Sequence, residues 1–377
     1  MISVQHTPSY NPAVVQAAVD RHFELLHLDE LIPKEGKITI KPNLLLKRRP
    51  EEGTTTHPAL VEAVVRRIQK VSNAQITLAD SPGGPFTKQA LEGIYRASGM
   101  EEVAKKTGAV LNYDVGSTHI PNPEGKLCKA FDLINPIAEA DFIVSICKLK
   151  SHCMTGLSGG VKNLFGCIPG LTKPEFHWRY PEERNFCGML LDLCGTVKPE
   201  ITFVDAVVSM EGDGPSSGDL RETDMTLCAT NPYELDLVLT KVIGRKPEDI
   251  PLVDCARERG LCPDSADEAT LCGDPLSTFA DFKMPKSRTV DFVTSIPKPL
   301  RGICEPIIRR YLTPRPKVLT NKCVGCGKCA ESCPAHTIAI VDKKACIDRS
   351  RCIRCYCCHE MCPIHAIQVK RSRLLKF

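Results

Sequence analysis

Two cysteine runs near the end of the chain have the spacing of iron–sulfur cluster ligands. Each follows Cys-x2-Cys-x2-Cys-x3-Cys-Pro, over residues 323–334 and 352–363. Three thiolates two residues apart can wrap one corner of a [4Fe–4S] cubane, and the fourth, before Pro, turns toward the neighbouring cluster. The spacing therefore predicts two [4Fe–4S] clusters with crossed ligands: Cys323, Cys326, Cys329 and Cys362 on cluster 1, and Cys352, Cys355, Cys358 and Cys333 on cluster 2.

Zinc is the alternative for such a pattern, because Cys-x2-Cys pairs also suit a tetrahedral zinc ion. Two complete runs, both with the trailing proline, favour the clusters. The runs also form an internal repeat, in which residues 323–340 align with 352–369. This arrangement resembles dicluster ferredoxins of the bacterial type, which implies a small α+β module with a turn, a short helix and a strand in each half. We expect this end of the chain to transfer single electrons.

The composition bounds the rest of the molecule. The chain has 377 residues, of which 42% are hydrophobic and 25% charged, as in an ordinary globular protein. This length predicts two or three domains. We place an α/β domain at 1–287, a Pro-containing linker at 288–317 and the ferredoxin-type module at 318–377. The net charge of +4 is too small to predict nucleic-acid binding.

Several absences in the sequence predict a cytoplasmic protein. The N-terminus has no basic segment followed by an apolar one, and no apolar run approaches the roughly 18 residues that a membrane span needs. Reduced thiols and clusters also suit a reducing compartment. From Val318 onward the sequence contains eleven Lys and Arg residues but only four Asp and Glu residues. We expect the basic tail from Lys370 to be solvated. The alternative is that it binds a membrane surface or an acidic redox partner protein.

Alternating strand and helix patterns precede the cysteine runs. Helix starts are indicated at Asn11-Pro12 and His57-Pro58, where a capping side chain precedes a proline. This alternation predicts an α/β fold with a mainly parallel sheet and flanking helices. The predicted strands cover residues 37–41, 75–79, 109–113, 141–148 and 201–205.

Polar side chains gather where these strands end, which is where open α/β sheets bind their ligands. The densest segment, residues 148–166, holds two glycine groups and three lysines. Such a segment predicts a loop whose amides and ammonium groups approach an anion, and the alternative is a glycine-rich crossover loop with solvated lysines. It matches neither Gly-x4-Gly-Lys-Ser/Thr nor Gly-x-Gly-x-x-Gly, so we predict no nucleotide site.

Six short motifs in register resemble the domain-of-unknown-function family 362 (DUF362) over roughly residues 1–245. They are Lys41-Pro-Asn43, Thr54-Thr-Thr-His57-Pro58, Asp80-Ser-Pro-Gly83, Lys148-Leu-Lys150-Ser-His152, Val161-Lys-Asn-Leu-Phe-Gly166 and Glu211-Gly-Asp-Gly-Pro215. Members of that family are often joined to a cluster-binding segment, so the resemblance implies an iron–sulfur protein, without a settled reaction. Asp213 stands where a typical member has Asn, which adds a carboxylate and puts the charge of the pocket in doubt at that point.

Two sets of residues are candidates for the chemistry of the α/β domain. The candidate catalytic residues are Lys150, His152, His177 and Asp80. The candidate ligands of an anionic substrate are Lys41, Asn43, Lys148, Lys162 and Asn163. Each has a plainer alternative: a structural histidine, a turn-capping aspartate or a solvated lysine. An acidic group, which could hold a divalent metal or only form a turn, consists of Asp205, Glu211, Asp213 and Asp219.

Two functions fit these patterns. In the first, the clusters deliver electrons to a reductive reaction on an anionic substrate or cofactor held by the α/β domain, as in an iron–sulfur oxidoreductase. In the second, the chain is a non-catalytic electron carrier or assembly factor that docks on a redox partner protein.

Overall fold

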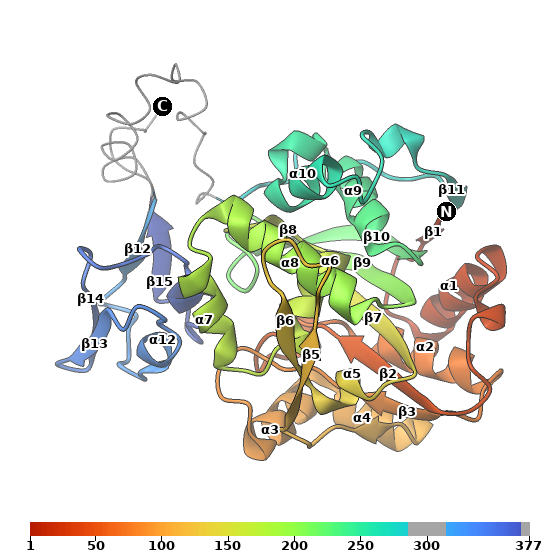
Figure 1. The fold of residues 1–377 in the computed structure, drawn as a ribbon, viewed down its shortest axis with the longest axis horizontal. Coiled ribbons are helices and arrows are strands. Elements are labelled where there is room, and N and C mark those ends of the chain that lie inside the picture. The colour runs from red at the N-terminus through yellow and green to blue at the C-terminus, as the bar shows by residue number, and fades with distance from the viewer. Residues whose placement is uncertain (286–313, 371–377) are drawn as a thin grey trace.

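The computed structural model describes residues 1–285 and 314–370, which form a large α/β domain and a small cysteine-rich module (Figure 1). Most of the predicted linker 288–317, and the basic tail after Lys370, lie outside the described residues. In the part of the chain that is described, no helix has both the length and the apolar character needed to cross a membrane.

A nine-stranded, mostly parallel sheet forms the centre of the large domain. Its strands follow the order β11-β1-β10-β9-β7-β2-β3-β4, and β8 pairs with β7 alone. The bounds are β1 Ile2–His6, β2 Lys37–Pro42, β3 Gln75–Leu78, β4 Val110–Leu111, β7 Phe142–His152, β8 Gly156–Ser158, β9 Ile201–Glu211, β10 Asp219–Ala229 and β11 Leu271–Gly273. The strands β2, β3, β4, β7 and β9 run parallel to their neighbours in this stretch. The predicted mainly parallel sheet is confirmed.

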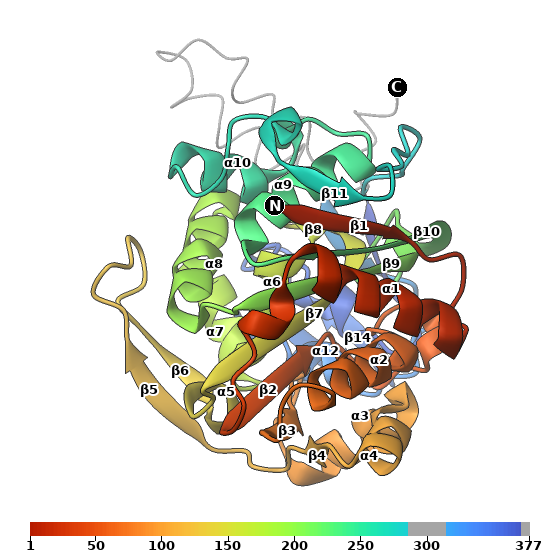
Figure 2. The same ribbon diagram turned by 90° about the vertical axis from the view of Figure 1, so that its right-hand side faces the viewer.

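Helices cover both faces of this sheet (Figure 2). On one face α1 and α2, with α3 and α4, enclose a core of aliphatic side chains; on the other α6, α8, α9 and α10 enclose two further cores. The helices are α1 Pro12–Leu25, α2 Pro58–Gln69, α3 Lys88–Ser98, α4 Met100–Thr107, α5 Asn135–Ala138, α6 Gly160–Asn163, α7 Thr172–Arg179, α8 Glu183–Val197, α9 Pro232–Val242 and α10 Pro251–Glu258. A hairpin of β5 Ser117–Pro121 and β6 Ala130–Ile134 completes the domain.

Local sequence signals account for the helix starts. The Asn11 side chain accepts a hydrogen bond from the Ala13 amide at the start of α1. At the start of α2 the His57 Nδ1 atom accepts from the Ala59 amide in the same way. Both helices carry proline in their first turn, where its missing N–H costs nothing. The two predicted starts are therefore confirmed.

The segment 148–166 is not the single loop that its composition predicts. The strand β7 continues to His152, and its end forms an antiparallel hairpin with β8, in which Lys150 lies opposite Ser158. The short helix α6 and a 3₁₀ turn at Leu164–Cys167 follow. Strand pairing satisfies the backbone here, so the lysines of β7 are held on a rigid element and not on a loop.

The small module consists of two similar halves. In the first, α12 Lys328–Glu331 leads to β13 Ile338–Val341; in the second, α13 Cys357–Glu360 leads to β15 Ile367–Lys370. The strand β14 Lys344–Ile347 pairs with β13, and β12 Arg315–Val318 pairs with β15. Each half therefore has the predicted turn, short helix and strand. The module begins at β12, a few residues before the predicted boundary at 318.

Candidate functional site

The two predicted cysteine sets each line a small cavity of the module. The first cavity, of about 310 Å³, is lined by Cys323, Cys326, Cys329 and Cys362. The second, of about 300 Å³, is lined by Cys333, Cys352, Cys355 and Cys358. In each case the fourth cysteine comes from the opposite half of the module, so the structure brings the residues together in the predicted crossed sets.

Donor groups surround the cysteine sulfur atoms. The Ala345 amide lies 3.4 Å from Cys323 Sγ, and the Ala366 amide lies 3.1 Å from Cys362 Sγ. In the second set, both the amide and the hydroxyl of Thr337 contact Cys333 Sγ, at 3.4 and 3.3 Å. Such donors stabilise thiolates that carry a cluster's negative charge.

The module docks on the α/β domain through polar contacts. Arg48 donates to the Pro363 carbonyl at 3.0 Å, and its guanidinium lies 3.2 Å from His365 Nε2. Ser216 donates to the carbonyl of Glu360 at 2.8 Å. Gly83 lies so close to Met361 that a Cβ atom there would be 2.5 Å from the sulfur. Two of these docking residues belong to the sequence motifs or adjoin them. Gly83 ends the motif that begins at Asp80, and Ser216 directly follows the motif that begins at Glu211.

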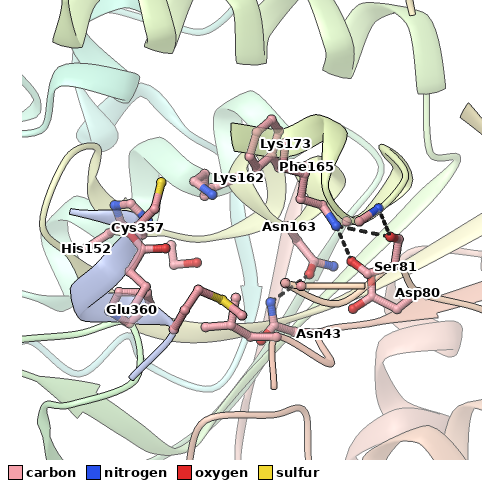
Figure 3. Close-up of a pocket in the computed structure, with 18 of the residues that line it drawn as sticks. Asn43, Asp80, Ser81, His152, Lys162, Asn163, Phe165, Lys173, Cys357 and Glu360 are labelled. Carbon is pink, nitrogen blue, oxygen red and sulfur yellow. Dashed lines mark hydrogen bonds and ion pairs between the residues drawn. The ribbon is translucent and has the colours of Figure 1, made fainter. Parts of the chain in front are cut away.

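A pocket opens between the two domains at this junction (Figure 3). It encloses about 740 Å³, part of it open to solvent. Figure 3 shows His152, Cys357 and Glu360 at one side and Asp80, Ser81 and Lys173 at the other, with Lys162 between them. Eight of the nine candidate residues of the α/β domain line it: Lys41, Asn43, Asp80, Lys150, His152, Lys162, Asn163 and His177.

A buried hydrogen-bond network forms the floor of the pocket. Lys41 Nζ lies 2.7 Å from Asp80 Oδ1 and 3.2 Å from Asn163 Oδ1. Asn43 donates to the same Asn163 oxygen at 3.1 Å, and its own oxygen accepts from Lys150 at 2.8 Å. Lys41 is fully engaged, since it also donates to the Pro42 carbonyl. This network holds the ends of the parallel strands β2 and β7 together.

Lys150 and Lys173 are buried cations whose hydrogen bonds go to neutral oxygens. Besides Asn43, Lys150 donates to the Thr54 carbonyl at 2.8 Å. Lys173 donates to the carbonyls of Ser81 and Pro82 and to the Ser81 hydroxyl. Burial, with neighbouring cations, lowers the pKa of Lys150 to about 7, and burial likewise lowers the pKa of Lys173 to about 7.

Lys162 is the pocket cation with the fewest contacts. Its Nζ lies 4.6 Å from the centre of the Phe165 ring, and it forms no ion pair with a carboxylate of the described residues. Burial lowers its pKa, which the carboxylate of Glu360 partly opposes. Four lysines thus line the pocket, and because Asp80 is already paired with Lys41, Glu360 is left as the acidic counterpart of the other three.

The tautomer of His152 follows from its hydrogen bonds. Its Nδ1 accepts from the amides of Met154 and Thr155 at 3.1 and 3.2 Å. The proton of the neutral ring must therefore lie on Nε2, which is 3.4 Å from Glu360 Oε1. Burial and the charge of Lys162 lower the pKa of His152 well below its usual range, so it stays neutral. His152 can donate a hydrogen bond into the pocket.

One buried polar atom of the pocket lining, His177 Nδ1, has neither a hydrogen-bond nor an ion-pair partner within residues 1–285 and 314–370. The His177 ring stacks on Phe186 at 4.3 Å, and burial lowers its pKa to about 3. Buried polar atoms without partners are costly, and a bound ligand is one way to satisfy them.

Lys148 is the one candidate of the α/β domain that lies outside this pocket. It forms a buried ion pair with Asp205 at 3.0 Å and donates to the Tyr10 hydroxyl at 2.6 Å. Asp205 also accepts from the His57 amide, so it is fully engaged. Glu211 pairs instead with Lys283 and Arg221. Among the described residues, no three His, Cys, Asp or Glu side chains lie close enough together to share a single metal ion, so the acidic group is not such a site.

Five of the pocket residues that were not among the candidates bear on the chemistry or on the docking of the module. Ser332, Cys357, Glu360 and Met361 come from the small module, and Lys173 comes from α7. The spacing of the cysteines gives no sign that a side chain between them faces another domain. The available signals were Cys357 and Glu360, which lie inside the second cysteine run but not at its ligand positions.

Comparisons with known proteins agree with this architecture. The family model described as "Domain of unknown function (DUF362)" matches residues 38–241, and a "4Fe-4S dicluster domain" matches residues 315–363. A thylakoid-associated protein of Synechocystis sp. is 26% identical over 330 residues, which cover 85% of this chain and 98% of that protein. Among solved structures, the lactate racemase apoprotein from Thermoanaerobacterium thermosaccharolyticum is similar over 63% of this chain and 55% of that chain, with a TM-score of 0.39 and 17% identity.

Fold and cysteine sets thus define an iron–sulfur protein with a 4Fe-4S dicluster domain of the electron-carrier type. Because the first model covers more than half of the sequence, the chain belongs to the DUF362 family, as the six motifs predict.

Proposed function

We propose that this protein carries electrons through two [4Fe–4S] clusters to a small anionic substrate, which is reduced in the pocket between the two domains. The observation that carries the proposal is the composition of this pocket. Its walls combine four lysines of the α/β domain, three of them buried, with residues that adjoin the cysteine sets of the module.

The cysteine cavities support the cluster assignment. Each is lined by the four cysteines that the two Cys-x2-Cys-x2-Cys-x3-Cys-Pro runs assign to one cubane. Backbone amides also point at the sulfurs of Cys323, Cys362 and Cys333. When bound, the two clusters would supply one electron each, which together suffice for a two-electron reduction. Reduced thiols and [4Fe–4S] clusters suit the proposed cytoplasmic, reducing setting.

The charges of the pocket support an anionic substrate. Lys150 and Lys173 are buried without a carboxylate partner in the described part of the chain, and Lys162 is in contact with an aromatic ring. A buried cation costs free energy unless an anion compensates it. A carboxylate or phosphate group placed beside Lys162 and Lys150 would do so, and His177 Nδ1 offers a further polar contact.

Lys150 is the residue best suited to supply a proton to the reduced substrate. Its pKa near 7 means that protonated and neutral forms are both populated at neutral pH, which is the condition for efficient general acid catalysis. His152 is neutral and donates from Nε2, so we assign it the orientation of the substrate and not proton transfer. Asp80 is paired with Lys41, so its proposed role is to hold the pocket floor.

The test uses the full chain purified without oxygen. Small molecules released on denaturation are identified by mass spectrometry from the wild type, from Lys162→Met and from the exposed-lysine control Lys34→Met. We expect an anionic compound in the wild type and the control but not in Lys162→Met, with equal iron in all three. That compound should be reduced by the wild type, and Lys150→Met or His152→Phe should abolish turnover. Turnover that survives these changes would contradict the pocket assignment, and a stable large protein partner would favour the non-catalytic carrier.

A further inference from the structure

The cavities of the two cysteine sets differ in their access to solvent. Besides Pro363, whose carbonyl accepts from Arg48 of the α/β domain, four exposed residues line the first cavity: Val324, Cys326, Ile340 and Ile364. The apolar ones are 63%, 39% and 38% exposed, respectively. By contrast, each residue that lines the second cavity is buried or only partly exposed. We call the four exposed residues the entry patch.

The second set borders the interdomain pocket at more positions than the first. Ser332 and Cys357 line the pocket and directly precede Cys333 and Cys358 of cluster 2, whereas only Met361, which precedes Cys362, does so for cluster 1. The hairpin β13–β14, which carries Ile340 of the entry patch, lies at the outer end of the molecule, away from the α/β sheet (Figure 1). The first cavity is therefore the one more open to solvent, and the second is the one with more neighbours in the pocket.

Lysines stand at the rim of the entry patch. Lys322 and Lys343 are exposed. The backbone of Lys343 lies directly against Gly325, where an added Cβ would be 2.5 Å from its carbonyl oxygen. Lys344 donates to the Cys323 carbonyl at 2.6 Å, so the turn of the hairpin is fixed beside the first cysteine set.

The charge of the module suits an acidic partner. Its described residues, 314–370, contain ten Lys and Arg against four Asp and Glu, and one of those carboxylates, Glu360, is buried in the pocket. This excess of six positive charges exceeds the roughly four negative charges that two oxidised clusters with their thiolates bring. An apolar centre with a cationic rim over a redox centre fits a protein surface with the opposite charge.

We propose that the entry patch is the docking site of an acidic one-electron carrier protein, which reduces cluster 1, and that cluster 2 is the exit toward the pocket. One electron leaves the carrier, which is oxidised by one unit, and enters cluster 1, which is reduced by one unit; no bond is formed or broken. The inference rests on the two clusters proposed above but not on the pocket ligand, so cluster reduction tests it separately from turnover.

The experiment follows reduction of the full, cluster-loaded chain by an acidic flavodoxin in its hydroquinone form, used as the probe in an anaerobic stopped-flow instrument. We expect the bimolecular rate of the wild type to fall as salt is added. The variant Lys322→Glu/Lys343→Glu should be slower by about tenfold or more at low salt. The control Lys34→Glu/Lys126→Glu, with both exposed lysines on the α/β domain, should change by less than about twofold.

Two further measurements separate docking from damage to the clusters. A photoreduced deazaflavin, as a small reductant, should reduce all variants at the same rate. Titration calorimetry with oxidised flavodoxin should show weaker binding to Lys322→Glu/Lys343→Glu alone. An unchanged flavodoxin rate in that variant would overturn the proposal. So would a larger slowing in Arg349→Glu, beside Cys352 of the second set, or a defect confined to binding of anionic phosphatidylglycerol vesicles.

Discussion

The small module and the pocket handle buried charge in opposite ways. In the module, cysteines that would be thiolates line two cavities, and amide donors point at their sulfur atoms. In the pocket, lysines are buried among neutral oxygens and an aromatic ring. The module thus supplies donors for negative charge, whereas the pocket keeps positive charge that its own residues compensate only in part. The difference indicates that the module is built around a resident group and the pocket around an exchangeable one.

The largest effect should come from the cysteine sets. Cys358→Ala should lose cluster 2, which lowers the iron content from about eight to about four per chain, because one missing thiolate opens the cubane. The adjacent Cys357→Ala is the matched control, since Cys357 lines the pocket and not the cluster cavity. Iron analysis and visible absorbance measure both. Equal iron loss in the two variants would contradict the assignment of Cys358 to the cluster and of Cys357 to the pocket.

The buried pair Lys41–Asp80 offers a test of stability. Asp80→Asn would leave Lys41 buried without its carboxylate, which typically costs about 3–5 kcal/mol of unfolding free energy. Asp132→Asn breaks an exposed pair with His119 and should cost less than about 1 kcal/mol. Denaturant unfolding of the cluster-loaded chain gives both values. If Asp80→Asn were as stable as the control and lost turnover alone, Asp80 would be catalytic and not structural.

Much of the distinction between the cluster module and the pocket could be predicted from the sequence. The cluster ligands lie within forty residues of one another, from Cys323 to Cys362, and their spacing follows from the shape of a cubane. The strand ends of a parallel sheet meet at one edge, which is why Lys41, Asp80 and Lys150 could be expected near one another, and all three line the pocket. Their chemical roles stay predictions.

Other features depended on contacts that no local pattern records. Lys148 and Lys150 are two residues apart on β7, yet the ladder to β9 shifts register between them, and Lys148 pairs with Asp205 outside the pocket. Glu360 faces the pocket only because the module docks on the α/β domain. The acidic group around Glu211 looked like a metal site because sequence proximity does not show that cations from elsewhere already pair with it.

Anion affinity should depend on the pocket lysines. Using inorganic phosphate and malonate as probes, we expect Lys162→Met and Lys150→Met to weaken binding by about 10- to 100-fold, because each removes a charge-assisted hydrogen bond worth about 1.5–3 kcal/mol. Lys34→Met serves as the exposed control. Calorimetry at constant pH measures the change. Equal affinity in all variants would show that the pocket cations do not bind these anions.

The same affinity should fall as pH rises above about 7. A bound anion favours the charged form of Lys150 and raises its pKa from about 7, so above that pH binding must take up a proton. Affinity should be level below pH 6 and decrease by up to about tenfold per pH unit above 7. In Lys150→Arg, whose side chain stays charged, anion affinity should fall less steeply with pH. The pH dependence that remains comes from Lys173, whose pKa is also about 7. An affinity that rises with pH would contradict this sign.

The central claim is that the charged pocket lies within electrostatic reach of one cluster, and an EPR-monitored redox titration at pH 6 tests it most directly. A unit charge acting across roughly 10 Å at an effective dielectric constant of about 20 shifts a potential by tens of millivolts. The account predicts that Lys162→Met lowers the potential of cluster 2 by such an amount and that of cluster 1 by clearly less. Two potentials that stay at their wild-type values, or that fall equally, would contradict it.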